Sequence, residues 1–375
     1  MSRKATQTLN DAKVAKKDEF YTFYHDIEKE INAYLTYDQD LFKDKVVLCP
    51  CDDPEFSNFT KYFAQNFERF GMKKLISTSY ATASKVFKTP IQLSRLEIDS
   101  EDYDPSKTDV KGKIFTLNRG ATPVNIHDLK WLYLDGDGDF RSEEVKALRD
   151  EADIIITNPP FSLFREFIAW ILEKNKKFLV IGNINCIAYK EIFPLLMSNQ
   201  VWLGTGIGRW ISGFWVPEGY DLYGTEAKLD KDGRRIVATN NCLWLTNMEH
   251  GKRHQPLSLM TMQDNIKFSR HKDIRGVGYK KYDNYDAIEV PYSDAIPSDY
   301  DGIIGVPLTF MDKYCPEQFE IVGPAMGWTQ STMSKEWKSS VGYVEDLKSN
   351  AGTRGYGIVE GVQKYHRILI RKVIS

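Results

Sequence analysis

Several common features are missing from this 375-residue sequence, and each absence excludes a class of protein. No apolar run approaches the roughly 20 residues that a helix needs to cross a bilayer, so we expect no membrane association. Residues 1–17 hold no apolar segment, so we expect no secretory signal peptide. The five cysteines lack the spacing of a disulfide framework and fit a reducing compartment, so we expect a cytoplasmic protein.

Metal-ligand patterns are also missing. Cys49 and Cys51 form a C-x-C pair, but no second cysteine pair lies at the spacing of a zinc site. The aspartates at 135, 137 and 139 resemble a calcium loop, yet Lys146 stands where the bidentate acid of such a loop belongs. We therefore expect no metal site.

The formal net charge of −2 is nearly balanced, so composition does not by itself indicate a polyanionic partner. Locally, residues 250–281 carry eight basic side chains against two acidic ones, and Phe268, His271 and Tyr279 lie among them. This mixture suits contacts to phosphates beside contacts to bases, although a solvated surface explains it equally well. The nucleic-acid interpretation selects four candidate phosphate contacts: Lys267, Arg270, Lys272 and Arg275.

What the sequence does contain is enough apolar material for a sizeable core, since 42% of its residues are hydrophobic and 13% are aromatic. Its length allows one large domain or two ordinary ones. Strand-like and helix-like segments alternate through residue 200, which predicts an α/β fold with a doubly wound parallel sheet. We expect helices at 18–37, 56–70, 143–151, 161–172 and 187–198, and strands at 45–49, 74–79, 153–157, 176–184, 201–207, 212–218 and 240–247.

Two regions interrupt this alternation. Residues 80–130 are polar and irregular, which indicates an insertion, and a third strand then ends in the acidic loop of WLYLDGDGDF. Charges, glycines and prolines increase near residue 248. We therefore expect one domain over residues 1–247, with the insertion inside it, and a second domain over residues 248–375.

The segment DIIITNPPFSLF, residues 153–164, carries the clearest chemical signal. Its first five residues are typical of a strand buried on both faces of a parallel sheet. Pro159 and Pro160 end that strand, because prolines donate no ladder hydrogen bond and their rings fix φ. The result is a rigid turn at the carboxyl end of a strand, where open α/β sheets bind ligands. Stiffness alone does not explain why Asn158 and Phe161 flank the prolines.

Methyl transfer to an amino nitrogen explains the presence of Asn158 and Phe161 beside the prolines. Asn, Asp or Ser followed by Pro-Pro and an aromatic, after a strand, is typical of methyltransferases that act on exocyclic or amide nitrogens. The amino group of adenine is a poor nucleophile, because its lone pair is delocalised into the ring. Two rigidly held acceptors, the side-chain oxygen of Asn158 and the carbonyl of Pro159, draw that nitrogen toward tetrahedral geometry. Pro160 stiffens the turn, and Phe161 offers a flat face to a base rotated out of the duplex.

Further blocks of sequence extend this interpretation. They are KDEFYTFYHDIEKEI, VVLCPCDDPEFSNFTKYFAQNF, DGDGDFRS, TNPPFSLF, GFWVPEGYDLYGTEA, NNCLWLTN, YDNYDAIEV and GVPLTFMDKYCPEQFE. In these blocks and their order, the chain resembles the EcoRI-type adenine-specific DNA methyltransferases. The resemblance covers most of the chain except residues 80–130 and 325–355.

The resemblance implies a fold and an activity. Residues 1–247 are expected to form a Rossmann-like methyltransferase sheet that uses S-adenosylmethionine, and residues 248–375 a smaller target-recognition module that binds double-stranded DNA. The implied reaction is site-specific methylation of N6 of a flipped adenine, in a restriction–modification or orphan modification system of a prokaryotic or phage-infected cell. No obligate protein partner is inferred.

The resemblance also implies a set of cofactor contacts. DEFYT resembles the segment that holds the methionine end of S-adenosylmethionine, CPCDDP stands in place of a glycine-rich loop, and GDF resembles the segment that contacts the cofactor adenine. The carboxylates of Asp52 and Asp53 suit this cofactor, because it carries an ammonium and a sulfonium but no pyrophosphate. Capping of the next helix also explains these two aspartates. The residues so implied are Tyr21, Thr22, Cys49, Pro50, Asp52, Asp53, Asp139 and Phe140, with Asp139 accepting from the adenine amino group and Phe140 packing on its ring.

Two other functions stay open at this point. One is a methyltransferase for a different amino group, in cytosine, RNA or a protein glutamine. The other is an inactive DNA-binding protein, which the missing glycine-rich loop favours. The sequence does not identify the DNA site that would be recognised.

Overall fold

The computed structural model divides into two compact units of discontinuous sequence. One unit contains residues up to Asn183 together with Gly206–His250, and the other contains Ile184–Thr205 together with Gly251 onward. Residues 184–205, which we expected in the first domain, thus group with the C-terminal residues. The structure describes residues 21–81, 104–120, 129–207, 211, 213–215, 227–229, 235–237, 241–345 and 354–373.

An eight-stranded sheet forms the centre of the first unit. Its spatial order is β5-β4-β3-β2-β6-β7-β12-β8, and the division between the two units falls within β8. Apolar, β-branched residues dominate the central strands, which suits burial on both faces. The strands are β2 (Val46–Cys49), β3 (Lys74–Thr78), β4 (Lys113–Asn118), β5 (Leu132–Tyr133), β6 (Ile154–Thr157), β7 (Lys177–Asn183), β8 (Trp202–Ile207) and β12 (Cys242–Thr246).

This sheet is mixed, so the predicted α/β class is confirmed, while the predicted parallel pairing is found only among its central strands. Strands β3, β2, β6 and β7 pair in parallel, whereas β4, β5 and β12 pair antiparallel. Strand β4 lies inside the expected insertion, where Phe115 and Leu117 are buried and alternate with the exposed Thr116 and Asn118. Residues 82–103 and 121–128 of that insertion lie outside the described residues.

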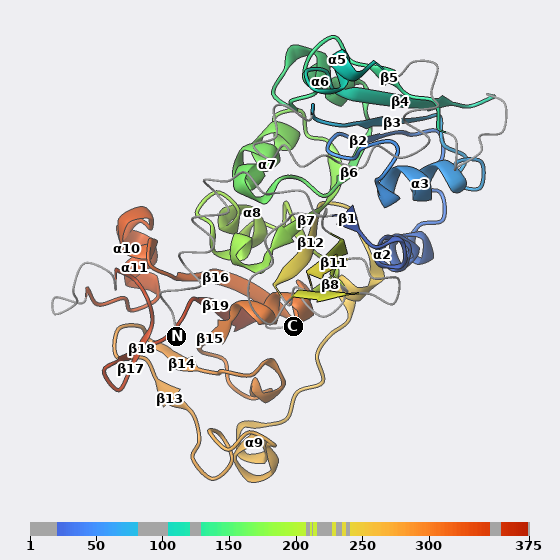
Figure 1. Ribbon diagram of the computed structural model, residues 1–375. Coiled ribbons are helices and arrows are strands. Elements are labelled where there is room, and N and C mark those ends of the chain that lie inside the picture. Colours follow the sequence, from blue (N-terminus) through green and yellow to red (C-terminus); the bar gives the residue numbers. More distant parts are fainter. Residues whose placement is uncertain are drawn as a thin grey trace. The chain divides into compact units, whose positions relative to one another are not determined.

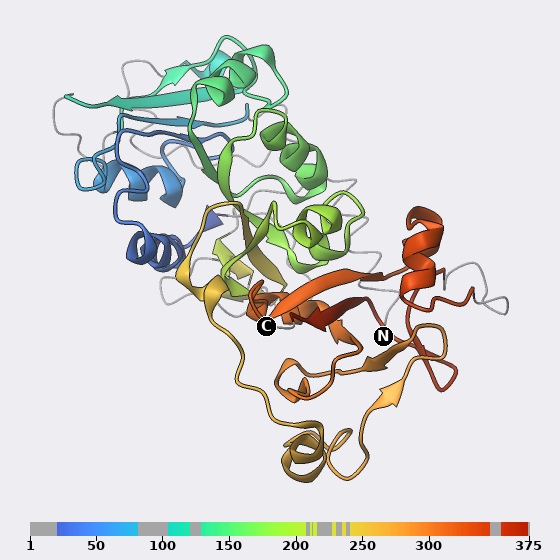
Figure 2. The same cartoon turned by 180° about the vertical axis from the view of Figure 1, so that it is seen from behind.

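Helices cover both sides of the parallel strands. Figures 1 and 2 show α2 and α3 on one side and α6 and α7 on the other. The core beneath α2 and α3 includes Val47, Ile154, Ile156 and Leu179, which point to one face because side chains alternate along a strand. The helices are α2 (Tyr24–Tyr37), α3 (Asn58–Gln65), the short α5 (Pro105–Thr108), α6 (Glu143–Glu151) and α7 (Phe164–Leu172), which follows the 3₁₀ turn η2 (Phe161–Leu163).

The expected helix over residues 18–37 begins later than predicted. Tyr21–Thr22 form strand β1, and α2 starts at Tyr24 after an extended Phe23. Strand β1 pairs antiparallel with β9 (Phe214–Trp215), so a partner far along the chain overrides the helical pattern at this end. Strand β9 also pairs with β11 (Arg235–Val237), and β11 with β10 (Ala227–Leu229), which completes a four-stranded sheet.

The second unit contains a five-stranded sheet in the order β13-β14-β15-β19-β16 and a two-stranded hairpin, β17-β18 (Figure 1, orange to red). Its sheet strands are β13 (Lys280–Lys281), β14 (Ala287–Glu289), β15 (Ile303–Pro307), β16 (Phe319–Ala325) and β19 (Arg367–Lys372), and its hairpin strands are β17 (Ile358–Val359) and β18 (Val362–Gln363). Inside this unit, Arg367 on β19 binds the buried Glu289 on β14 at 2.7 Å, and the hydroxyl of Tyr282 donates to the same carboxylate.

Short helices connect these strands. In the part of the chain that the structure describes, no helix is long and apolar enough to span a membrane. The helical segments of this unit are α8 (Phe193–Met197), α9 (Met262–Phe268), α10 (Thr329–Thr332), α11 (Lys335–Ser340) and the 3₁₀ turns η3 (Ile184–Ala188), η4 (Gly251–His254), η5 (Ser293–Ala295) and η6 (Leu308–Lys313).

Candidate active site

Two loops that the sequence singled out begin at the same edge of the first unit's sheet. Strands β2 and β6 are parallel neighbours, with Val47 opposite Ile154 and Leu48 opposite Ile155. The loop after β2 starts at Pro50, and the loop after β6 starts at Asn158. The expected cofactor loop and the expected catalytic loop are therefore adjacent at the carboxyl ends of the parallel strands.

Asp52 joins these two loops through its side chain. One carboxylate oxygen accepts a hydrogen bond from the hydroxyl of Ser57 at 2.7 Å, and the other accepts from the hydroxyl of Thr157 at 2.5 Å. Ser57 caps the N-terminus of α3, and Thr157 is the last residue of β6. Burial raises the pKa of the Asp52 carboxyl to about 7, with the two hydroxyls opposing that rise. Asp52 therefore does not cap the helix itself but holds the residue that does.

The backbone of the same loop is fixed to β3. The amide of Asp52 donates to the carbonyl of Thr78 at 2.9 Å, and the hydroxyl of Ser77 donates to the carbonyl of Asp52 at 2.6 Å. The hydroxyl of Thr78 donates to the carbonyl of Pro50 at 3.0 Å. Strands β3 and β6, which lie on either side of β2, thus both hold the loop after β2, and its geometry is rigid without any glycine.

The Asn158–Phe161 turn has the form that the sequence predicted. Pro159 is buried, and Asn158, Pro160 and Phe161 are half-buried. The backbone is extended at Pro160 and then enters η2, where the amide of Leu163 donates to the carbonyl of Pro160 at 3.0 Å. The turn directly follows a fully buried strand, so its polar atoms are held at the edge of the core.

Strand β1 brings Tyr21 and Thr22 to the same region. The carbonyl of Thr22 accepts from the Asn58 side chain at 2.7 Å, and the rings of Tyr21 and Phe56 meet edge to face with their centroids 6.4 Å apart. Thr22 also pairs with Phe214 on β9, whose ring lies 6.3 Å from that of Phe161. The buried hydroxyl of Thr22 has no hydrogen-bond partner among the described residues, which is costly unless a ligand supplies one.

Asp53 belongs to an ion cluster that sequence reasoning missed. Its carboxylate accepts from the amide of Glu55 at 2.9 Å and lies 3.8 Å from the ammonium of Lys113 on β4. Lys113 also hydrogen-bonds the Glu55 carboxylate, and its ammonium lies 4.4 Å above the ring of Trp131. Lys113 begins a strand in which buried and exposed residues alternate, and this alternation was the signal in the sequence that could have revealed the cluster. We did not predict β4, so the cluster was missed.

The two cysteines of CPCDDP lie in different surroundings. Cys49 is completely buried in the core shared by α2 and α3, so only its backbone borders the loop. Cys51 is half-buried, and its thiol lies near the carboxylate of Asp52. Burial, together with the charge of Asp52, raises the pKa of both thiols well above the usual value, so neither is a thiolate near neutral pH.

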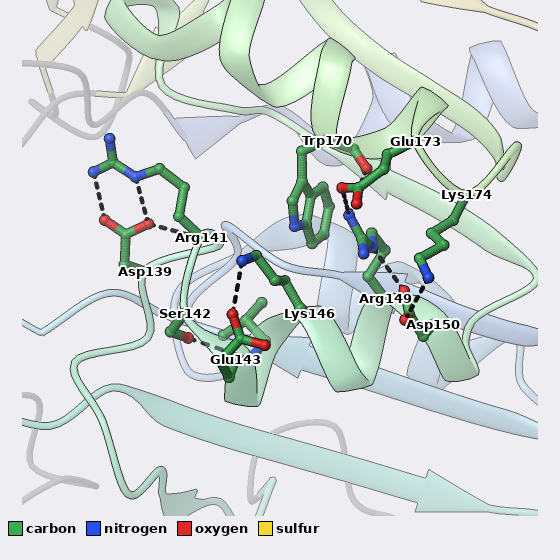
Figure 3. A network of polar contacts seen from close by, with 11 residues as sticks. Asp139, Arg141, Ser142, Glu143, Lys146, Arg149, Asp150, Trp170, Glu173 and Lys174 are labelled. Atoms are coloured by element: carbon green, nitrogen blue, oxygen red, sulfur yellow. Dashed lines mark hydrogen bonds and ion pairs between the residues drawn. The ribbon is translucent and has the colours of Figure 1, made fainter.

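Asp139 follows β5, and strands β4, β3 and β2 separate β5 from β6. The loop nevertheless returns to the end of β3, because Gly138 packs so closely on the carbonyl of Ser79 that a side chain would collide with it. Figure 3 shows the Asp139 carboxylate bound by Arg141 through two hydrogen bonds of 2.9 and 2.7 Å. Phe140 is buried, with ring centroids 5.1 Å from Phe167 and 5.7 Å from Trp170, so most of its ring packs on α7.

The sequence model of a family described as "Adenine-specific methyltransferase EcoRI" matches residues 8–373. The chain belongs to this family. It is 44% identical to the Type II methyltransferase M.EcoRI of Escherichia coli over 335 residues, which are 89% of this chain and 94% of that protein. It is 32% identical to M.MpnI of Mycoplasma pneumoniae and to M.MgeORF184P of Mycoplasma genitalium, each over 97% of this chain and 98% of the relative. No solved structure matches the chain.

Membership of the EcoRI family confirms the predicted family and makes the protein a DNA adenine methyltransferase. The loop after β2, which has two aspartates and no glycine, therefore occurs in a chain that the family model matches over residues 8–373. The inactive DNA-binding protein and the methyltransferase for another amino group, which the sequence left open, are both set aside.

The four predicted phosphate contacts of this methyltransferase all lie on or just after α9, in the second unit. Lys267, Arg270, Lys272 and Arg275 are exposed. Arg270 pairs with Asp294 at 3.0 Å, whereas the other three have no ion pair among the described residues. Phe268, beside the Lys267 ammonium at 4.9 Å, is 61% exposed. The structure thus gathers these residues on one exposed segment.

Proposed function

We propose that this protein transfers a methyl group from S-adenosylmethionine to N6 of an adenine rotated out of duplex DNA, at the site on the first unit. The observation that carries the proposal is the direct link between the two loops, because Asp52 after β2 binds Thr157 immediately before Asn158. A cofactor held by the first loop and a base held by the second are then brought within reach of each other.

The residues around the β2 loop fit S-adenosylmethionine. When bound, this cofactor supplies the electrophilic methyl group. It carries two positive centres and no pyrophosphate, so the carboxylates of Asp52 and Asp53 suit it better than a glycine-rich amide cradle would. The unpartnered Thr22 hydroxyl supplies a polar group of the kind that a ligand satisfies. We assign cofactor contacts to Tyr21, Thr22, Asp52, Asp53, Asp139 and Phe140, and to the backbone of Cys49 and Pro50.

We assign binding of the target base to the turn after β6. The Asn158 side-chain oxygen and the Pro159 carbonyl accept hydrogen bonds from the adenine amino group and localise its lone pair. Both prolines fix the backbone, so these acceptors need little reorganisation when charge develops. Phe161, half-buried against Phe214, offers the remaining face of its ring to the flipped base.

We assign target recognition to the second unit. The support is the exposed α9 segment with its unpaired cations, which suits a phosphate backbone. In this assignment residues 1–247 form a Rossmann-like catalytic domain and residues 248–375 the recognition module, with residues 184–205 packing on the recognition side. The reaction takes place in the cytoplasm of a prokaryotic or phage-infected cell.

A nucleoside analysis tests the proposal. The purified protein is incubated with methyl-labelled S-adenosylmethionine and duplex DNA of mixed sequence, and the DNA is then digested to nucleosides. We expect the label in N6-methyladenine alone. Label in N4-methylcytosine, in RNA or in protein, or DNA binding without any label, contradicts it. A parallel incubation with the Asn158→Ala protein controls for contaminating methyltransferases.

A further inference from the structure

We infer that Asp52 and Thr157 are positioning residues for the catalytic turn, in which the Asp52 carboxylate holds the Thr157 hydroxyl and thereby fixes the orientation of Asn158. The inference rests on the proposed function of that turn. It changes the role expected of Asp52, since the carboxylate then acts through its neighbours and not only through its charge.

The geometry around Asp52 supports this role. Its side chain is 5% exposed, and Thr157 is fully buried, so the hydrogen bond between them is shielded from water. The two carboxylate oxygens bind hydroxyls from separate elements, Ser57 at the start of α3 and Thr157 at the end of β6. Thr157 is bonded directly to Asn158 in the chain, so a rotation at Thr157 is passed on to the acceptor that the reaction needs.

The protonation state of Asp52 decides which way these hydrogen bonds run. An ionised carboxylate only accepts, so both hydroxyls donate to it. A protonated carboxyl donates a hydrogen bond from one of its oxygens. A hydroxyl that faces this oxygen then accepts the hydrogen bond and no longer donates its own proton to the carboxyl. The titratable groups around Asp52 are the carboxyl of Asp53 and the thiols of Cys49 and Cys51, and the Cys51 thiol also lies beside the Thr157 hydroxyl.

This chemistry predicts a pH-dependent reaction rate. Burial raises the pKa of Asp52 to about 7, so the carboxylate that holds Thr157 as a donor forms only as the pH rises through that value. The single-turnover rate of methylation is therefore expected to rise with pH and to level off above about 7.

Two substitutions at residue 157 test the inference. Thr157→Val keeps the β-branched shape but removes the hydroxyl, whereas Thr157→Ser keeps the hydroxyl. We expect Thr157→Val to lower the single-turnover rate about tenfold or more, as for a misplaced catalytic group, and to abolish the pH transition near 7. Its affinity for S-adenosylmethionine, measured by calorimetry, is expected to change less than about twofold. Thr157→Ser is expected to retain the rate and the transition.

Thr246→Val is the matched control. Thr246 is also a fully buried threonine at the end of a strand of this sheet, and its hydroxyl donates to the carbonyl of Phe178 at 2.6 Å, away from the site. We expect this variant to keep both the rate and the pH transition. If Thr246→Val and Thr157→Val lower the rate equally, the effect comes from lost packing and the inference is wrong.

Asp52→Asn covers the case in which Thr157→Val does not fold. Asparagine keeps the shape of the side chain but cannot titrate, so this variant is expected to show no pH transition near 7. Persistence of the wild-type transition in Asp52→Asn, or a wild-type rate in Thr157→Val, overturns the inference. Both comparisons are made against an active wild-type enzyme, so they differ from a failure of the proposed function, in which the wild type itself puts no label into adenine.

Discussion

The guanidinium of Arg141 holds the carboxylate of Asp139 in a two-pronged pair, with hydrogen bonds of 2.9 and 2.7 Å to its two oxygens (Figure 3). The amide of Arg141 donates to the same carboxylate at 2.8 Å. Arg141 therefore orients the Asp139 carboxylate before any ligand arrives, and a cofactor bound as we propose shares that carboxylate with Arg141.

Removing the Asp139 carboxylate should weaken cofactor binding. Asp139→Ala is expected to reduce the affinity for S-adenosylmethionine by roughly 1–3 kcal/mol, the usual cost of a buried donor left without its acceptor. Calorimetry measures this change, and DNA affinity without cofactor should hardly move. Arg141→Ala is the control, because it leaves the carboxylate in place and is expected to cost less. Equal losses in both variants would show that the ion pair, and not a cofactor contact, is responsible.

Arg149 should matter for folding rather than for catalysis. Its side chain is 2% exposed and binds Asp150 at 2.8 Å, Glu173 at 2.7 Å and the carbonyl of Trp170 at 2.9 Å, so it connects α6 to α7 (Figure 3). Arg149→Ala is expected to lower the free energy of unfolding by about 2–4 kcal/mol, measured with urea, because it removes a buried guanidinium that packs on the Trp170 ring and leaves the Trp170 carbonyl without its donor.

Lys146→Ala provides the comparison for Arg149. Lys146 pairs with Glu143 at 2.8 Å on the surface of the same helix, and such exposed pairs contribute less than about 1 kcal/mol. The Arg149 guanidinium holds the pKa of the Asp150 and Glu173 carboxyls below their usual values. The stability from these pairs is present above the unfolded pKa and lost as the pH falls through the lowered values. A loss in Lys146→Ala as large as in Arg149→Ala would contradict this account.

Asp52 should make the folded protein less stable as the pH rises. Because burial raises its pKa from the usual value to about 7, the folded state keeps a proton that the unfolded state releases at lower pH. The contribution of Asp52 is fully present below its unfolded pKa of about 4 and is lost as the pH rises toward 7. Urea unfolding without cofactor should show this decline in the wild type, and a smaller one in Asp52→Asn. Parallel pH profiles for the two proteins would refute the assignment.

The α9 segment should contribute a salt-dependent part of DNA binding. Lys267, Lys272 and Arg275 have no ion pair among the described residues, so each alanine substitution is expected to reduce the slope of log affinity against log salt by about one. Arg270 already pairs with Asp294, so Arg270→Ala should change the slope less. Titrations of a fluorescent duplex at several salt concentrations measure these slopes. Unchanged slopes would remove this segment from the phosphate interface.

Local chemistry made parts of the fold predictable from sequence. Ser142 caps α6 by accepting from the amide of Val145, and the helix runs over Glu143–Glu151 as expected. The apolar run before Asn158 formed β6, and the two prolines ended it. These features depend on neighbours within a few residues, which a sequence displays directly.

Pairings between distant segments were not predictable in this way. Strand β12 runs antiparallel to β7, and β1 pairs with β9 almost two hundred residues later. The hydrogen bonds that hold the site also join distant segments, because Thr157 contacts Asp52 and Lys113 contacts Glu55 only in the folded chain. The motifs gave the residue types of the site, while the contacts that fix their orientation came from the structure.

The central claim is that Asn158 acts in the transition state of methyl transfer. Its most direct test is the single-turnover rate of methylation by Asn158→Ala with saturating cofactor and DNA. The account predicts a fall of about 10²-fold or more, the scale for one preorganised electrostatic contact, with cofactor and DNA affinities little changed. A rate equal to that of the wild type would contradict the mechanism, even though the chain belongs to the family.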